Sequence, residues 1–81
     1  MSAEQMFYEL GFVNNITSYG CVRYKTNIDE DGFYLEISFN IKKRKFRLSK
    51  QGSGIARPFY ADVDHLKAIQ KQYEEFGWLQ C

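Results

Sequence analysis

The sequence predicts one α+β domain over residues 1–81, with a three-stranded antiparallel sheet that packs two helices on one face, in the order α-β-β-β-α. Two patterns carry this prediction. Apolar residues fall on every second position of 33–39, the period of a strand with one covered face. Apolar residues of 66–76 recur at helical spacing. An aromatic content of 17% supplies the rings that a small core needs.

The first expected element is a short helix over 3–10. Met6, Phe7 and Leu10 lie on one stripe of this segment, and Gly11 follows as a residue that ends helices in the left-handed conformation. Phe12 can then fold back onto the helix. A helix of about two turns depends on tertiary packing, so this stripe is expected to join the core.

Three strands are expected next. Residues 14–20 are polar and predict a loop or an irregular approach to the first strand, which we place at 21–27 from the alternation of Val22 and Tyr24 with charged residues. The acidic segment 27–32 ends in Asp-Gly, a hairpin signal. The second strand covers 33–39, a polar turn covers 41–44, and the third strand follows over 45–50.

A second helix closes the domain. After the glycine-rich break at 51–54, Pro58 favours an extended approach, and Asp62 is the expected N-cap. The expected apolar stripe consists of Leu66, Ile69, Tyr73 and Phe76. Gly77 ends the helix. Trp78 then either covers the core or, if exposed, anchors a partner.

Composition excludes several classes of protein. The formal net charge is +1, from 11 basic and 10 acidic residues, so the chain lacks the overall basic excess of a dedicated nucleic-acid binder. Cys21 and Cys81 form no metal or redox motif and are expected to be reduced thiols. Neither a signal peptide nor a membrane span is indicated, so we expect a cytoplasmic protein.

The sequence contains no convincing catalytic or metal-binding set. His65 stands without a placeable nucleophile, and helix capping explains Asp62 and Asp64 better than metal ligation does. The acidic turn at 29–32 is too short for an EF-hand loop, and Gly52 and Gly54 fit no phosphate-binding motif. We therefore expect no enzyme activity, no cofactor and no metal.

One surface is a candidate binding site. Six of the nine residues over 42–50 are basic, and the strand alternation places further cations and one aromatic on the sheet face away from the helices. Such a surface could contact phosphates and bases, or it could be a solvated or protein-binding face. The expected binding residues are Arg23, Lys25, Tyr34, Lys43, Arg44, Lys45 and Arg47.

The predicted element order is also that of the double-stranded-RNA-binding domain, but the likeness is one of topology only. The positions that would contact RNA are acidic here: the second helix starts Asp62-Val63-Asp64-His65, and the first hairpin loop is Asp29-Glu30-Asp31-Gly32. Both would repel phosphates. We therefore carry no RNA-binding function across.

The chain also resembles small uncharacterised proteins encoded by phages and prophages of Gram-positive bacteria. The resemblance lies in the opening segment 6–12, the closing segment 66–78, and the strand 33–39 with its basic turn. It implies a mobile-element origin and action in the host cytoplasm.

The expected function is non-catalytic: a small accessory module that contacts a host or phage protein. The alternative is a weak nucleic-acid binder that uses the same residues. Either a monomer or a homodimer that pairs through an edge strand is expected, because an open sheet leaves unpaired edges.

Overall fold

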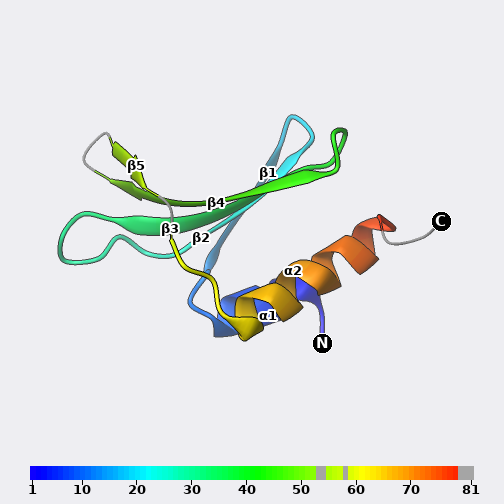
Figure 1. The fold of residues 1–81 in the computed structure, drawn as a ribbon, viewed down its shortest axis with the longest axis horizontal. Coiled ribbons are helices and arrows are strands. Elements are labelled where there is room, and N and C mark those ends of the chain that lie inside the picture. Colours follow the sequence, from blue (N-terminus) through cyan, green and yellow to red (C-terminus); the bar gives the residue numbers. More distant parts are fainter. Residues whose placement is uncertain (53–54, 58, 79–81) are drawn as a thin grey trace.

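The structure is a computed structural model that describes residues 1–52, 55–57 and 59–78. The predicted α+β class is confirmed: two helices and one antiparallel sheet are present. The elements in chain order are α1 (Ala3–Glu9), β1 (Asn14–Ser18), β2 (Cys21–Lys25), β3 (Tyr34–Asn40), β4 (Lys45–Gly52), β5 (Ile55–Arg57) and α2 (Val63–Phe76). The sheet lies over both helices, which share one of its faces (Figure 1).

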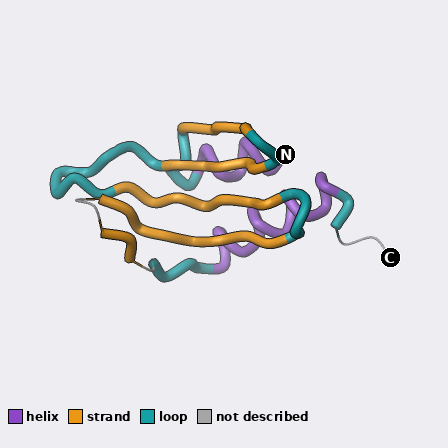
Figure 2. Tube along the Cα trace, turned by 90° about the horizontal axis from the view of Figure 1, so that it is seen from above, coloured by secondary structure: helices purple, strands orange, loops and turns teal. Residues whose placement is uncertain are grey.

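The predicted number of strands is wrong. The sheet has five strands in the order β1-β2-β3-β4-β5, four of them with at least five residues and a short fifth (Figure 2). β1 replaces the expected loop at 14–20, and β2 ends at Lys25 rather than at residue 27. The expected extended approach at Pro58 lies outside the described residues.

The prediction missed β1 because its sequence carries no period-two pattern. Its five residues are exposed or half-buried, so neither face selects apolar side chains. The strand is formed instead by its pairing with β2 around a two-residue turn, Tyr19-Gly20. Both turn residues have positive φ, 50° and 75°, as a type I′ hairpin turn requires. Asparagine usually precedes the glycine of such a turn, and with tyrosine in its place the hairpin signal is absent.

The core lies between the sheet and the helices. Val22, Tyr24, Ile37 and Phe39 point from β2 and β3 toward the buried residues of α1 and α2. Phe7 of α1 stacks on Tyr24 with ring centroids 4.3 Å apart. The expected helix stripes hold with one exception: Leu66, in the first turns of α2, is 60% exposed.

Helix ends follow the predicted signals. Asp62 is the N-cap of α2 and accepts a hydrogen bond from the backbone N–H of His65. Gly77 ends the helix with φ of 77°. Trp78 packs on Tyr73 and Phe76 with centroid distances of 4.6 and 4.8 Å, so its ring covers the end of the core. The rest of the C-terminal tail, 79–81, lies outside the described residues.

A buried hydrogen bond joins the sheet to α2. The Tyr24 hydroxyl donates to Oε1 of Gln72, and both residues are buried. Burial, assisted by the nearby carboxylates of Glu4 and Glu75, raises the pKa of Tyr24 from 10 to about 12. The folded state therefore holds this proton more tightly than the unfolded state does.

This difference predicts a loss of stability in alkali. Below pH 10 the Tyr24 phenol is protonated in both the folded and the unfolded state, so its contribution to the free energy of unfolding is fully present. As the pH rises from 10 toward 12 only the unfolded state ionises, so at pH 11 the free energy of unfolding falls by about 1.4 kcal/mol from this group. Urea unfolding at pH 9 and pH 11 measures the loss. Tyr24→Phe should reduce it by that amount, and equal losses in both proteins would contradict the assignment.

Candidate binding face

The candidate site is the sheet face opposite the helices, which we call the outer face. Strand partners in register point to the same face, so one row across the sheet contains Ile16, Arg23, Ser38 and Arg47. No helix of the described chain lies over this face, and Figure 2 shows both helices behind the sheet. The outer face is therefore available to a partner.

Three of the predicted binding residues meet in one pocket of the outer face. Arg23, Lys45 and Arg47 line a cavity of about 300 Å³ together with the polar side chains of Ser38 and Asn40. We call it the cationic pocket. Lys45 and Arg47 form no ion pair with any described residue, so their charges are available to an anionic group.

A buried carboxylate lies beside this pocket. Glu36 is only 8% exposed although it points to the outer face. Its Oε2 accepts a hydrogen bond of 2.6 Å from Nε2 of Gln51, and its Oε1 lies 3.7 Å from Nε of Arg23. The carboxylate thus holds the guanidinium of Arg23 against the sheet and offsets its charge. Sequence analysis did not find this role, because strand alternation alone places Glu36 at a solvent-facing position.

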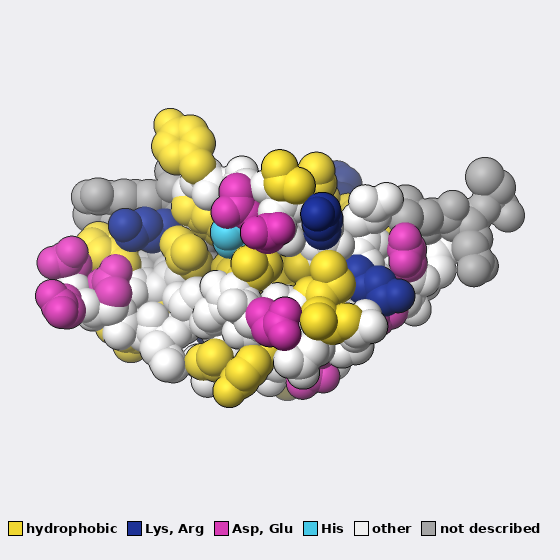
Figure 3. All heavy atoms as spheres, turned by 90° about the horizontal axis from the view of Figure 1, so that it is seen from below, with side chains coloured by type: hydrophobic (Ala, Val, Ile, Leu, Met, Phe, Trp, Pro, Cys, Tyr) yellow, Lys and Arg dark blue, Asp and Glu magenta, His cyan; other side chains and the backbone are white. Residues whose placement is uncertain are grey.

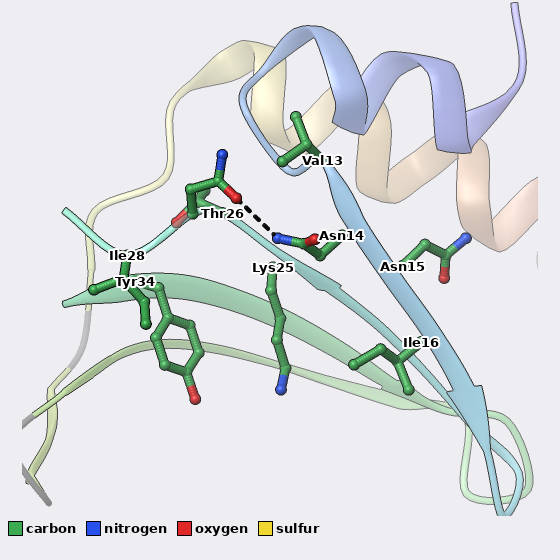
Figure 4. A pocket seen from close by; sticks show the side chains of 9 residues that line it. Val13, Asn14, Asn15, Ile16, Lys25, Thr26, Ile28 and Tyr34 are labelled. Atoms are coloured by element: carbon green, nitrogen blue, oxygen red, sulfur yellow. Dashed lines mark hydrogen bonds between the residues drawn. The ribbon is translucent and has the colours of Figure 1, made fainter. Parts of the chain in front are cut away.

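Two other predicted residues line a second, larger pocket. Lys25 and Tyr34 contribute to a cavity of about 610 Å³, whose apolar wall consists of Val13, Ile16 and Ile28. We call it the apolar pocket. In Figure 4 the side chains of Ile16, Lys25 and Tyr34 all point away from the helices. The Lys25 ammonium lies 5.5 Å from the centroid of the Tyr34 ring, a cation–π contact that orders both side chains.

The apolar wall was not foreseen from the sequence. Ile16 is 42% exposed and Ile28 is 69% exposed. Each is a lone isoleucine in a polar stretch, one in β1 and the other in the β2–β3 connection, and only the fold brings them together. Nδ2 of Asn14 donates to Oδ1 of Asn27, 3.2 Å away, and so links the two segments.

The remaining predicted residues, Lys43 and Arg44, lie in the β3–β4 turn at one end of the outer face, and both are exposed. The Lys43 backbone N–H donates to Oδ1 of Asn40, and Arg44 has a positive φ of 55°. A hydrogen bond from the Ile41 N–H to the Gly20 carbonyl joins this turn to the β1–β2 turn. Tyr19, fully exposed there, extends the basic end with an aromatic ring that sequence analysis did not single out.

The charged residues are unevenly distributed between the sheet layer and the helix layer, although the net charge of the chain is small. Residues 14–57 hold nine of the 11 basic and four of the 10 acidic residues, a net charge of +5. The rest of the chain holds two basic and six acidic residues, a net charge of −4. Figure 3, viewed from the helix side, shows acidic side chains over the helices and at one end of the molecule. The cations thus concentrate in the sheet layer, around the outer face.

The His, Cys, Asp and Glu side chains of the described residues are largely dispersed over the fold. Among them no group of His, Cys, Asp or Glu is arranged to hold a metal ion. Oδ1 of Asp62 lies 2.7 Å from Nδ1 of His65, and the hydrogen bonds from the His65 backbone and side chain lower the pKa of Asp62. This pair caps α2.

Comparison with known proteins gave no match to a protein family, a curated protein or a solved structure. Within the described residues, no helix is long and apolar enough to cross a membrane.

Proposed function

We propose that the chain is a non-catalytic binding module that holds an acidic segment of a partner protein on its outer face. One observation carries the proposal: a pocket lined by Arg23, Lys45 and Arg47 lies on the same face as a larger apolar pocket that Lys25 helps to line. A segment with both carboxylates and apolar side chains would satisfy the two pockets together. Charge complementarity of this kind gives specificity and speeds association.

A protein ligand fits this face better than a nucleic acid does. Binding of single-stranded nucleic acid relies on aromatic rings on which bases stack. On the outer face of the described strands β1–β4, Tyr34 is the one aromatic residue, and the Lys25 ammonium already covers its ring. The exposed ring of Tyr19 lies beyond the strands, in the β1–β2 turn. The apolar wall formed by Val13, Ile16 and Ile28 has no counterpart in a phosphate backbone. Nucleic acid is the alternative ligand, and nuclease treatment in a capture experiment distinguishes it from a protein.

The source of the partner follows from the resemblance to phage and prophage proteins. If the chain belongs to a mobile element of a Gram-positive bacterium, its partner is a host or phage protein in the cytoplasm. An accessory protein of this kind needs only a stable domain that presents one surface. The open outer face (Figure 2) supports the presence of such a surface, and the mobile-element origin rests on the resemblance alone.

Charge reversal in the cationic pocket tests the proposal. The tagged chain is used to capture proteins from Gram-positive cell lysate, with and without nuclease. We expect a discrete protein to be retained after nuclease treatment. Lys45→Glu/Arg47→Glu should weaken its binding at least about 100-fold, because two attractive charges become repulsive where the partner's carboxylates lie. Both residues are exposed, so the fold should be unchanged.

A matched control uses the helix layer. Lys67→Glu/Lys71→Glu makes the same change in net charge on α2, on the other side of the molecule, and should leave binding within about twofold. Equal losses in the two double variants would mean that net charge alone matters and would remove the outer face as the site. Material that disappears on nuclease treatment would replace the acidic protein with a nucleic acid.

A further inference from the structure

β1 forms one edge of the sheet. β1 pairs with β2 on one side, and in the described part of the chain no strand pairs with its other side. Residues 14–17 are all exposed. The side chains of Asn15 and Thr17, which point to the helix side, are exposed as well, so the described helices leave β1 uncovered on that face too.

This edge lacks the devices that protect exposed strands. Natural edge strands commonly carry a lysine or a proline, or contain a bulge, to prevent pairing with another chain. β1 has the sequence Asn-Asn-Ile-Thr-Ser, with neither a charge nor a proline. Its register with β2 is continuous from Asn14 to Ser18, so it contains no bulge. In contrast, β2, which pairs with β1, carries two cations, and β4, farther across the sheet, carries three.

The turn determines which backbone groups point outward. Ser18 and Cys21 close the two-residue turn, so they form a hydrogen-bonded pair. Such pairs recur at every second position, and Ile16 and Asn14 therefore also direct their backbone groups toward β2. The backbone N–H and C=O groups of Asn15 and Thr17 point to the open edge.

We infer that a second copy of the chain pairs with this edge, antiparallel and with the two-fold axis at Ile16. In this register Asn15 of each copy lies opposite Thr17 of the other, so all four outward groups of each strand find a partner. Ile16 lies opposite Ile16 of the second copy in a non-hydrogen-bonded pair, where side chains approach most closely. A shift by one residue would leave outward groups of one copy without partners on the other.

The edge favours a second copy over an acidic segment. An acidic strand added to β1 would meet no cation on β1 itself, whereas an uncharged strand pairs with its own copy without repulsion. The two-fold axis is perpendicular to the sheet, so both outer faces lie on one side of the dimer. Arg23 is in register with Ile16, and the two Arg23 positions would be three strand spacings apart, about 14 Å. The dimer would thus present two cationic pockets side by side.

Cysteine cross-linking tests the register. In a Cys21→Ser/Cys81→Ser background, Ile16→Cys places two thiols at a pair with Cα atoms about 4.5 Å apart, within the range of about 4.4–6.8 Å that a disulfide spans. We expect this variant to form a covalent dimer under mild oxidation at least tenfold faster than Asn14→Cys or Ser18→Cys alone. In each of these two variants, the introduced cysteines of the two copies would be four residues out of register, about 13 Å apart along the strand. A mixture of the Asn14→Cys and Ser18→Cys chains should cross-link to each other.

A backbone variant provides a second test. Thr17→Pro removes an N–H that points to the open edge and leaves the bonds to β2 in place, so circular dichroism should be unchanged while the dimer dissociates at least tenfold more readily. Thr17→Ala, which keeps the N–H, should dimerise as the wild type does in sedimentation experiments. Equal cross-linking at positions 14, 16 and 18, or equal dimerisation of the two Thr17 variants, would overturn the inference. The inference would also be overturned if the chain stays monomeric at millimolar concentration and its β1 amides become protected from hydrogen exchange only when an acidic peptide is added. This outcome would assign the edge to the partner.

Discussion

Phe39→Ala is expected to lower the free energy of unfolding by about 3–5 kcal/mol, the usual cost of truncating a buried phenylalanine to alanine. Phe39 lies on the central strand β3 and is fully buried. Its ring meets aromatic rings from both helices and from the neighbouring strands, those of Phe7, Tyr24, Phe46, Tyr73, Phe76 and Trp78. These rings come from segments far apart in the chain, so they cannot easily collapse into the cavity.

A domain of this length has roughly 4–12 kcal/mol of stability in total. The variant should therefore unfold at a much lower urea concentration, or be partly unfolded without urea. Phe46→Ala is the matched control: it lies opposite Phe39 in the β3–β4 register and on the same face, but it is 41% exposed. We expect it to lose less than half as much. A loss below about 1 kcal/mol for Phe39→Ala would mean that the packing of the helices on the sheet is wrongly assigned.

The parts of this fold that the sequence predicts are those in which burial selects the side chains. The strand around Phe39 and the helix around Ile69 each bury one face, and each shows the corresponding period. β1 is different, because it is held by backbone pairing and by a turn whose residues are Tyr19 and Gly20. No apolar pattern marks such a strand, and an edge of the sheet was consequently missed.

The same distinction applies to the binding face. Strand alternation alone was enough to place Arg23, Lys45 and Arg47 together, because residues in register share a face. The apolar pocket depended on β1 and on the course of the β2–β3 connection, so neither Ile16 nor Ile28 could be assigned to it in advance. The Glu36 carboxylate contacts side chains from the strands on either side of β3. These contacts could not be anticipated either, because they depend on the directions in which those side chains extend across the sheet.

The charged pair formed by Arg23 and Glu36 links the stability of the sheet to its binding function. Removing one partner of such a pair costs more than the pair contributes, because the other group is left buried without its counter-charge. We expect Arg23→Ala to lower the free energy of unfolding by about 2 kcal/mol, less than for a fully buried pair, since the Arg23 side chain is 42% exposed and water can take part of its place. Urea unfolding measures the loss.

The double variant Arg23→Ala/Glu36→Gln separates the two roles. Because the glutamine side chain carries no charge, the double variant contains no uncompensated anion at this position, and most of the lost stability should return. Binding of the partner should stay weak, because the cationic pocket still lacks the Arg23 guanidinium that lines it. If the double variant recovers binding together with stability, Arg23 acts only through the order of the sheet. The acidic segment would then be held by Lys45 and Arg47 alone.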